Sequence, residues 1–318
     1  MAAAGGKSSG SSKTRSSNQG GQAKELQTGS GQSLETQRRT PLFHAEHAAR
    51  YDRQRIIVEY QELTGANLVV MIDQITPTNM TILEDLLFDC DPSKDLHLLL
   101  ASPGGDGETA LRMVRSMQQR CRELTVIIPD LAKSAATILC LGAHCILMGP
   151  GGDLGPIDPQ MISYTEDGRP RLVASAKEIV EAVDEAEKRV TTNPDSYPLF
   201  ASLLSDVNML MVEQARFALG RSAALMEEAL KSPGIRDDRT VQALAEALRA
   251  PLIEVPTSHS AVVSPDDAIS FGLPVLKAET ASIEWNLLWS LWTRYFAMGC
   301  WPAGLNGIYE GARASHKG

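Results

Sequence analysis

Short aliphatic runs that end in small, turn-forming residues and lead into helical patterns constrain the fold of this chain most strongly. The stretch LLLASPGGDGETALRM at 98–113 is one such unit, and IIPDLAKSAATILCLGAH at 127–144 is the next. Short, buried aliphatic strands that alternate with helices pair in parallel, since each connecting helix crosses the sheet. The pattern therefore predicts an α/β layer fold with a mostly parallel sheet.

The same alternation extends to both sides of these two units. Strands are expected at 67–73, 95–102, 124–130 and 144–149, and helices at 43–63, 76–90, 107–120 and 134–143. Beyond residue 150 helical patterns dominate from about 174 to 250, before a strand-like piece at 252–257. Three parts are predicted: a disordered low-complexity tail at 1–42, a folded domain at 43–280, and an aromatic helix with a C-terminal tail at 281–318.

Composition narrows the classes of function. The tail is rich in Ser, Gly, Gln and Lys and cannot bury enough apolar surface to order itself. The net charge of −9 argues against general nucleic-acid binding. Five cysteines without metal-type spacing indicate reduced thiols in a cytoplasmic protein, and no metal or cofactor is expected. No run approaches the ~20 apolar residues of a membrane span.

The second unit places Ser134 where a strand and loop become an apolar helix. A serine there can cap the helix. It can also be a nucleophile whose oxyanion is held by free N–H groups of the helix N-terminus. The small residues Ala135 and Ala136 would let a substrate approach closely.

The first unit places Gly104 and Gly105 directly after a strand. Glycines allow unusual dihedral angles and leave bare N–H groups. The stretch matches neither of the glycine-rich phosphate-binding motifs, GxGxxG and GxxxxGK[ST]. Glycine N–H groups that face a serine at another helix N-terminus are what an oxyanion site for acyl transfer requires.

The segments SPGG, KSAAT and LGPIDPQ at these distances resemble the serine peptidases of the Clp and crotonase-like fold. The resemblance is to the serine dehydrogenase proteinase family, relatives of signal peptide peptidase A. It runs from about 50 to 276 and is strong over 96–160. It implies repeated β-β-α units, an ATP-independent peptidase without cofactor, and a homo-oligomer acting on peptide or protein substrates.

The same resemblance assigns roles residue by residue. Ser134 would be the nucleophile, and the backbone N–H groups of Gly105 and Ala135 would form the oxyanion hole. The loop Gly104–Asp106 would bind an extended substrate backbone as an added strand. Peptide bonds would then be hydrolysed through an acyl-enzyme.

The sequence does not identify a single residue as the general base. Clp-type peptidases carry a histidine about twenty-five residues after the serine, and that region has none here. Relatives of signal peptide peptidase use a lysine, which makes Lys177 the first candidate. On an ideal helix Lys177 is expected to point toward solvent. His259, which precedes the family-like ending, is the alternative.

Four tryptophans lie between residues 285 and 301. Trp285, Leu288, Trp289, Trp292 and Phe296 form a stripe at helical spacing. A helix docked on the domain, a subunit interface and an interfacial membrane anchor all fit this stripe. The helix has little basic charge, so protein contact is favoured and membrane association is left open.

Two alternatives to a peptidase remain. A crotonase-like enzyme acting on an acyl thioester would share the glycine-rich oxyanion site but needs no serine nucleophile. A non-catalytic scaffold would keep the fold without a base, and the missing histidine motivates it.

Overall fold

The computed structural model describes residues 40–164, 170–256 and 261–318. The chain divides into two units, Met1–Ala48 and Ala49–Gly318. In the first unit the described part is the short helix α2 (Pro41–Glu46), which Thr40 caps by accepting a 3.2 Å hydrogen bond from the N–H of Phe43. The second unit contains both the domain predicted at 43–280, from Ala49 on, and the C-terminal part predicted at 281–318.

A seven-stranded sheet forms the centre of the second unit, in the order β11-β10-β1-β2-β3-β5-β9. Its parallel members are β1 (Asn67–Ile72), β2 (Leu96–Ala101), β3 (Leu124–Ile128), β5 (Cys145–Met148) and β9 (Val275–Lys277). The antiparallel strands β10 (Ile308–Glu310) and β11 (Ser315–Lys317) extend the sheet beyond β1. The prediction of an α/β fold with a mostly parallel sheet is confirmed.

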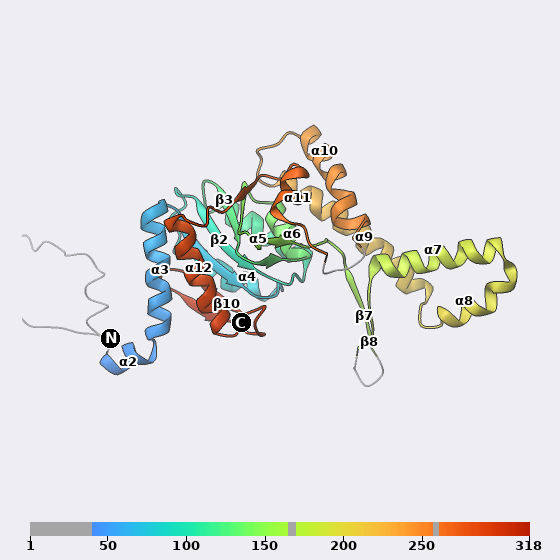
Figure 1. The fold of residues 1–318 in the computed structure, drawn as a ribbon, viewed down its shortest axis with the longest axis horizontal. Helices are drawn as coiled ribbons and strands as arrows, with labels where there is room; N and C mark the ends of the chain where they lie inside the picture. Colours follow the sequence, from blue (N-terminus) through green and yellow to red (C-terminus); the bar gives the residue numbers. More distant parts are fainter. Residues whose placement is uncertain (1–39, 165–169, 257–260) are drawn as a thin grey trace, which may run out of the picture. The chain divides into compact units, whose positions relative to one another are not determined.

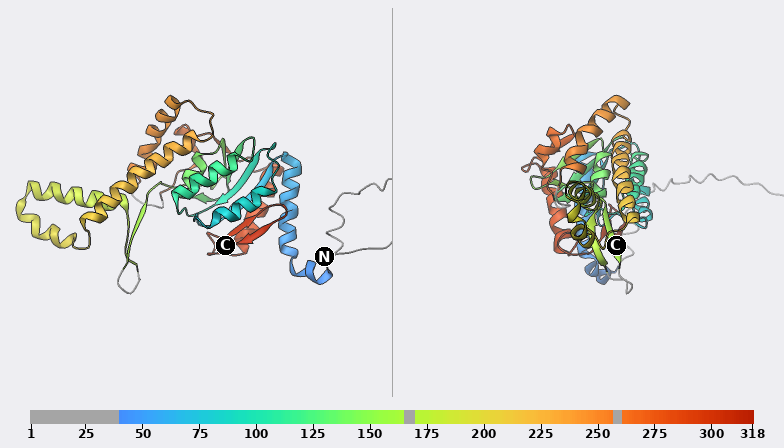
Figure 2. Two further views of the ribbon diagram at one scale, coloured as in Figure 1. Left: turned by 180° about the vertical axis from the view of Figure 1, so that it is seen from behind. Right: turned by 90° about the vertical axis from the view of Figure 1, so that its right-hand side faces the viewer.

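Helices cover both faces of this sheet (Figures 1 and 2). The helices α3 (Ala48–Thr64) and α12 (Ile283–Ala297) pack on one face. On the other face lie α4 (Asn79–Phe88), α5 (Gly107–Gln118) and α6 (Ala135–Leu141). Strand residues alternate between the two faces, since successive side chains of a strand point in opposite directions.

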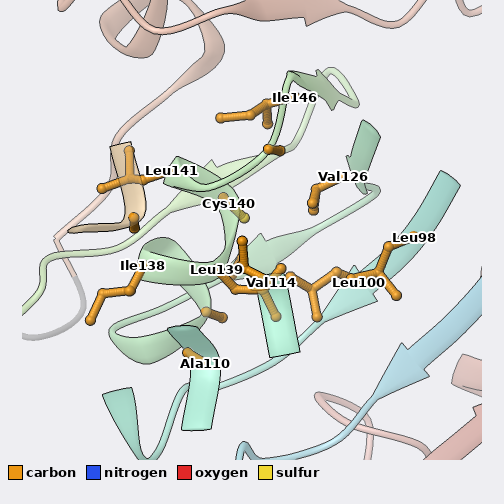
Figure 3. Packing of buried hydrophobic residues seen from close by; sticks show 14 of the residues in the cluster. Leu98, Leu100, Ala110, Val114, Val126, Ile138, Leu139, Cys140, Leu141 and Ile146 are labelled. Carbon is orange, nitrogen blue, oxygen red and sulfur yellow. The ribbon is translucent and has the colours of Figure 1, made fainter. Parts of the chain in front are cut away.

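The alternation is clear in β2. Leu98 and Leu100 join the core under α5 and α6, whereas Leu99 joins the core under α3 and α12. Figure 3 shows the first of these cores, with side chains of the strands packed against Ala110 and Val114 of α5 and the apolar face of α6. Burial on both faces explains why these strands are mostly aliphatic rather than alternating with polar residues.

A second layer of short strands follows the main strands at their carboxyl ends. The strand β4 (Leu131–Ala132) pairs in parallel with β6 (Asp153–Leu154). Single bridges add Ser102 beside Ala132 and Ile75 beside Gly105. The strands β1, β2 and β3 therefore continue into a second strand segment before the helix that follows each of them, as the expected β-β-α units require. The two loops of interest lie in this layer.

The chain between residues 160 and 254 differs from the expectation in two places. An antiparallel hairpin, β7 (Gln160–Tyr164) with β8 (Pro170–Ser175), precedes the helices. The helices that follow are α7 (Ala176–Thr192), α8 (Tyr197–Leu203), α9 (Met209–Lys231) and α10 (Asp238–Arg249), with the 3-10 turn Pro194–Ser196 before α8 and α11 (Pro265–Ser270) later. The strand expected at 252–257 is wrong: Ala250–Glu254 continues α10 as a π-helical turn, and its apolar Leu252 is buried in the helical packing.

The aromatic helix α12 is docked on the sheet. Trp285, Leu288 and Trp292 of the predicted stripe are buried, whereas Trp289 and Phe296 are 46% and 51% exposed. A groove of about 680 Å³ runs along these aromatic rings and is lined also by Pro129. Among the described residues, no helix combines the length and the apolar character needed to cross a membrane.

Candidate active site

Ser134 occupies a strained turn between β4 and α6. Its φ of 53° and ψ of −115° make it the one non-glycine residue with positive φ in the described parts of the chain. Such a conformation is costly for a residue with a Cβ and persists where the surroundings enforce it, commonly at functional sites. Although Ser134 is at the N-cap position, its side chain makes no capping hydrogen bond. The cap interpretation of this serine is therefore wrong.

The Ser134 hydroxyl is available for chemistry. The residue is half-buried, and its Oγ has no hydrogen-bond partner within the part of the chain that the structure describes. Thr137 of α6 fixes the turn, because its buried hydroxyl shares its one proton between the carbonyls of Ala132 (3.1 Å) and Gly155 (2.8 Å). The surrounding hydrogen bonds thus fix the backbone of the turn and leave the Ser134 side chain free.

Gly104 and Gly105 are brought directly against this turn. Their φ angles are +101° and +137°, which only glycine adopts readily. A Cβ at Gly104 would lie 2.7 Å from the Cβ of Ser134 and 3.1 Å from the amide nitrogen of Ala135. The two turns predicted from the sequence therefore meet, and the absence of a side chain at Gly104 is what allows them to.

Two backbone N–H groups at this junction have no acceptor among the described residues. They belong to Gly105 and to Ala135, which is the first residue of α6. The neighbouring Gly104 N–H differs, because it donates to the Ser102 hydroxyl at 3.1 Å. The N–H groups of a first helical turn point along the helix axis and favour negative charge. This junction can therefore stabilise a developing oxyanion.

One edge of the Gly104–Asp106 loop is already paired within the chain. The Ile75 N–H donates to the Gly104 carbonyl at 2.7 Å, and the Ile75 carbonyl accepts from the Asp106 N–H at 2.8 Å. The Asp106 carboxylate caps α5, accepting from the N–H of Thr109 at 2.7 Å. An added substrate strand would therefore have to pair with groups other than these. No sequence pattern predicted a role for Ile75, because its contact with the loop joins segments about thirty residues apart.

Lys133 precedes the candidate nucleophile but does not face it. Its buried ammonium pairs with Asp153 and donates to the carbonyl of Ala261 at 3.1 Å. Gly155 lies against the Lys133 side chain, where a Cβ would overlap it. The Lys133 side chain therefore links the end of β4 to β6 and to the segment at Ala261.

Lys177 is not directed toward solvent, so that expectation is wrong. Its side chain is only 15% exposed, because the turn after α10 covers it. Its ammonium donates to the carbonyls of Glu254 and Pro256, the latter at 3.0 Å, and lies 3.6 Å from the Glu181 carboxylate. The ammonium thus contacts two carbonyls and a carboxylate, and none of these contacts involves Ser134.

His259 is the histidine candidate for the base, and His144 is the histidine nearest to Ser134 in the sequence. His259 lies outside the described residues. His144 is at the far end of α6, where its Nδ1 accepts from the N–H of Leu124 at 3.1 Å, and burial lowers its pKa. It is therefore remote from Ser134 along the helix. In the described part of the chain no group of three or more His, Cys, Asp or Glu side chains could hold a metal ion.

Comparison with known proteins gives the following matches. A family model described as ClpP-like SDH-type serine proteinase matches residues 87–188. An uncharacterized protein of Methanocaldococcus jannaschii is 25% identical over 182 residues, which cover 57% of this chain and 54% of the relative. A second uncharacterized protein of that organism is 30% identical over 69 residues, 22% of this chain and 24% of the relative. The chain thus spans about half the length of the first relative.

Among solved structures, a membrane-bound stomatin-specific protease is similar in two mutant forms. One aligns with a TM-score of 0.39 at 16% identity over 70% of this chain and 81% of its own. The other, in complex with a substrate peptide, has the same TM-score and identity and covers 78% of this chain and 88% of its own.

Proposed function

We propose that this chain hydrolyses peptide bonds through an acyl-enzyme on Ser134, without ATP or a cofactor, because its residues 87–188 match the family model of the ClpP-like SDH-type serine proteinases. The observation that carries this proposal is the junction of the two turns. A strained serine with a free hydroxyl lies against Gly104, beside two N–H groups that lack acceptors.

The proposed reaction follows from that arrangement. The Ser134 oxygen attacks the substrate carbonyl while a base takes its proton, and the carbonyl oxygen becomes an oxyanion held by the N–H groups of Gly105 and Ala135. Collapse of this intermediate breaks the C–N bond, and the base returns the proton to the leaving amine. Water then attacks the ester by the same route and releases the second product and the free serine.

Two residues are candidates for the base. Lys177 would have to leave the carbonyls of Glu254 and Pro256 and lose its proton before it could accept one from Ser134. His259 precedes Ala261 by two positions in the sequence. The Ala261 carbonyl accepts a hydrogen bond from Lys133, which is the residue before Ser134. A base contributed by a neighbouring copy of the chain would also fit the expected homo-oligomer, which light scattering of the purified protein tests.

The nucleophile is tested by replacing Ser134 with alanine. Labelling by a fluorophosphonate probe should disappear, and hydrolysis of an unstructured protein substrate should fall by about 10³-fold or more. Ser270→Ala, at an exposed position of α11, is the matched control and should behave as the unaltered protein. Undiminished hydrolysis by Ser134→Ala would exclude the proposed mechanism.

The base is tested with Lys177→Met and His259→Gln, each assayed across pH 5–10. The variant that lacks the true base should have a kcat lower by roughly 10²–10⁴-fold. The variant at the other position should retain most of the activity. A lysine base also predicts activity that rises with pH as the ammonium loses its proton. If both variants retain full activity, neither residue is the base.

The scaffold alternative is favoured by one observation: no basic side chain contacts the Ser134 hydroxyl within the described residues. A scaffold should leave Ser134 unlabelled by the fluorophosphonate probe, although the protein is folded. Labelling at Ser134 would exclude it. The thioester alternative predicts thermal stabilisation by coenzyme A esters, and a strained serine elbow is not needed for that reaction.

A further inference from the structure

We propose that Asn79 is a positioning residue for the oxyanion site. Its side chain fixes the backbone turn at 73–76, and this turn holds Gly104 and Gly105 in place. The inference rests on the proposed function of the Gly105 N–H. It assigns a role to a residue outside both turns, at the first position of α4. Ile75 holds the two glycines, Asn79 holds the turn that carries Ile75, and water cannot replace the bonds of the buried Asn79 amide.

The first step is the contact between Ile75 and the two glycines. Its two backbone hydrogen bonds, of 2.7 and 2.8 Å, bracket Gly105 on both sides. A Cβ at Gly105 would overlap the Ile75 carbonyl oxygen, so the two backbones are in direct contact. The Ile75 side chain is fully buried in the main core. Any shift of the Ile75 backbone therefore moves the peptide that carries the Gly105 N–H.

The second step is the clamp on the turn that carries Ile75. The Asn79 amide donates to the Gln74 carbonyl at 2.8 Å and to the Asp73 carboxylate at 3.0 Å, and it also contacts the Tyr309 hydroxyl. Its carbonyl oxygen accepts from the Thr76 hydroxyl. Asn79 thus bonds the residues on both sides of Ile75, from Gln74 to Thr76.

The third step is burial. Asn79 is 6% exposed and Tyr309 is fully buried, so water cannot take over the bonds that this amide makes. Burial also raises the pKa of Asp73. A carboxylate at position 79 would face the Asp73 carboxylate and the Gln74 carbonyl, and it could donate a hydrogen bond to neither. An amide is the side chain that offers donors and an acceptor at this point.

The test combines amide hydrogen exchange with kinetics on the full-length protein. In Asn79→Ala, the Ile75 and Asp106 amides should exchange at least about tenfold faster, because the bonds around Gly105 open more often. Amides in the middle of β2 should keep their protection, which separates a local effect from general loss of stability. Thr81→Ala is the matched control, since Thr81 is an exposed residue of α4 and none of the hydrogen bonds around Asn79 involves it.

The kinetic readout is kcat per fluorophosphonate-titrated site. It should fall about 10- to 100-fold in Asn79→Ala, because a displacement of about 1 Å at an oxyanion donor is enough for such losses, while the pH profile keeps its shape. A merely structural role would lower the titratable fraction and leave kcat per site unchanged. Tyr309→Phe, which keeps the ring and removes one hydroxyl, is the milder variant if Asn79→Ala does not fold.

The outcomes separate the two proposals. Unchanged exchange at Ile75 and Asp106 in Asn79→Ala and Tyr309→Phe would overturn the positioning role. Faster exchange with unchanged kcat per site would show that Asn79 fixes the turn but that catalysis does not depend on it, which overturns the inference as well. If the unaltered protein shows no labelling at Ser134, the proposed function fails, and the exchange experiment still decides whether Asn79 holds the glycine turn.

Discussion

Gly104 is a residue at which the candidate site has no room for a side chain. Alanine there would need a φ of +101° and would place its Cβ 2.7 Å from the Cβ of Ser134. We expect Gly104→Ala to cost about 1–3 kcal/mol in the free energy of unfolding from backbone strain alone. Labelling of Ser134 should fall about 10²-fold, since the turns must separate.

The matched control for this prediction is Gly220→Ala. Gly220 is an exposed helical glycine of α9 with open space where a Cβ would be built. The same substitution should there stabilise the protein by up to about 1 kcal/mol and leave labelling unchanged. Chemical denaturation and probe labelling measure both effects. Normal labelling in a folded Gly104→Ala protein would contradict the described packing of the two turns.

At the scale of elements, the contact between α3 and β2 contains a pH-sensitive pair. His97 of β2 shares a 2.8 Å hydrogen bond with the Tyr60 hydroxyl of α3. Burial lowers the pKa of His97, so the folded protein binds a proton there less readily than the unfolded chain. The stability from this group is therefore complete above its unfolded pKa of about 6.5 and is lost as pH falls toward the lower folded value.

We accordingly expect the melting temperature to fall between pH 7.5 and pH 5, and to fall less in His97→Asn. The variant should be less stable at pH 7.5, because it loses the bond to Tyr60. Differential scanning calorimetry at several pH values measures this. His144 also has a lowered pKa, so its titration will remain in the variant. An equal fall in the two proteins would rule out His97 as a source of acid sensitivity.

At the scale of the molecule, a buried ion pair joins three distant segments. Arg53 of α3 donates to Glu310 of β10 at 2.7 and 3.0 Å, and Tyr295 of α12 donates to the same carboxylate at 2.7 Å. The two charged side chains are 5% and 0% exposed. Removal of one partner leaves the other charge buried without compensation, which typically costs about 3–5 kcal/mol.

Glu310→Ala should therefore lower the free energy of unfolding by about that amount in urea denaturation. Glu185→Ala is the control, because it breaks an exposed pair with Arg189 on α7 and should cost less than about 1 kcal/mol. Equal losses in the two variants would mean that the C-terminal strands contribute little to the fold.

The local sequence determined the elements and the two turns. Aliphatic runs at the length of single strands, alternating with helices, require burial on both faces and hence parallel pairing. Two glycines after one strand and a serine at the start of an apolar helix indicate an oxyanion site. The glycines leave bare N–H groups, and the helix N-terminus favours negative charge. The hairpin β7–β8 and the π-helical end of α10 could not be predicted, since both depend on packing against remote residues.

Only the tertiary structure decided which residues hold the two turns together. Residue types predicted that the two glycines and Ser134 could form one site, and the resemblance to a serine proteinase family implied the role of Gly105 within it. The sequence carried no signal for Ile75 and Asn79, whose backbone and amide bonds act across the fold, nor for the carbonyls that cover Lys177. Hydrogen bonds between segments distant along the chain leave no periodic pattern, because they depend on the positions of atoms that the sheet brings together.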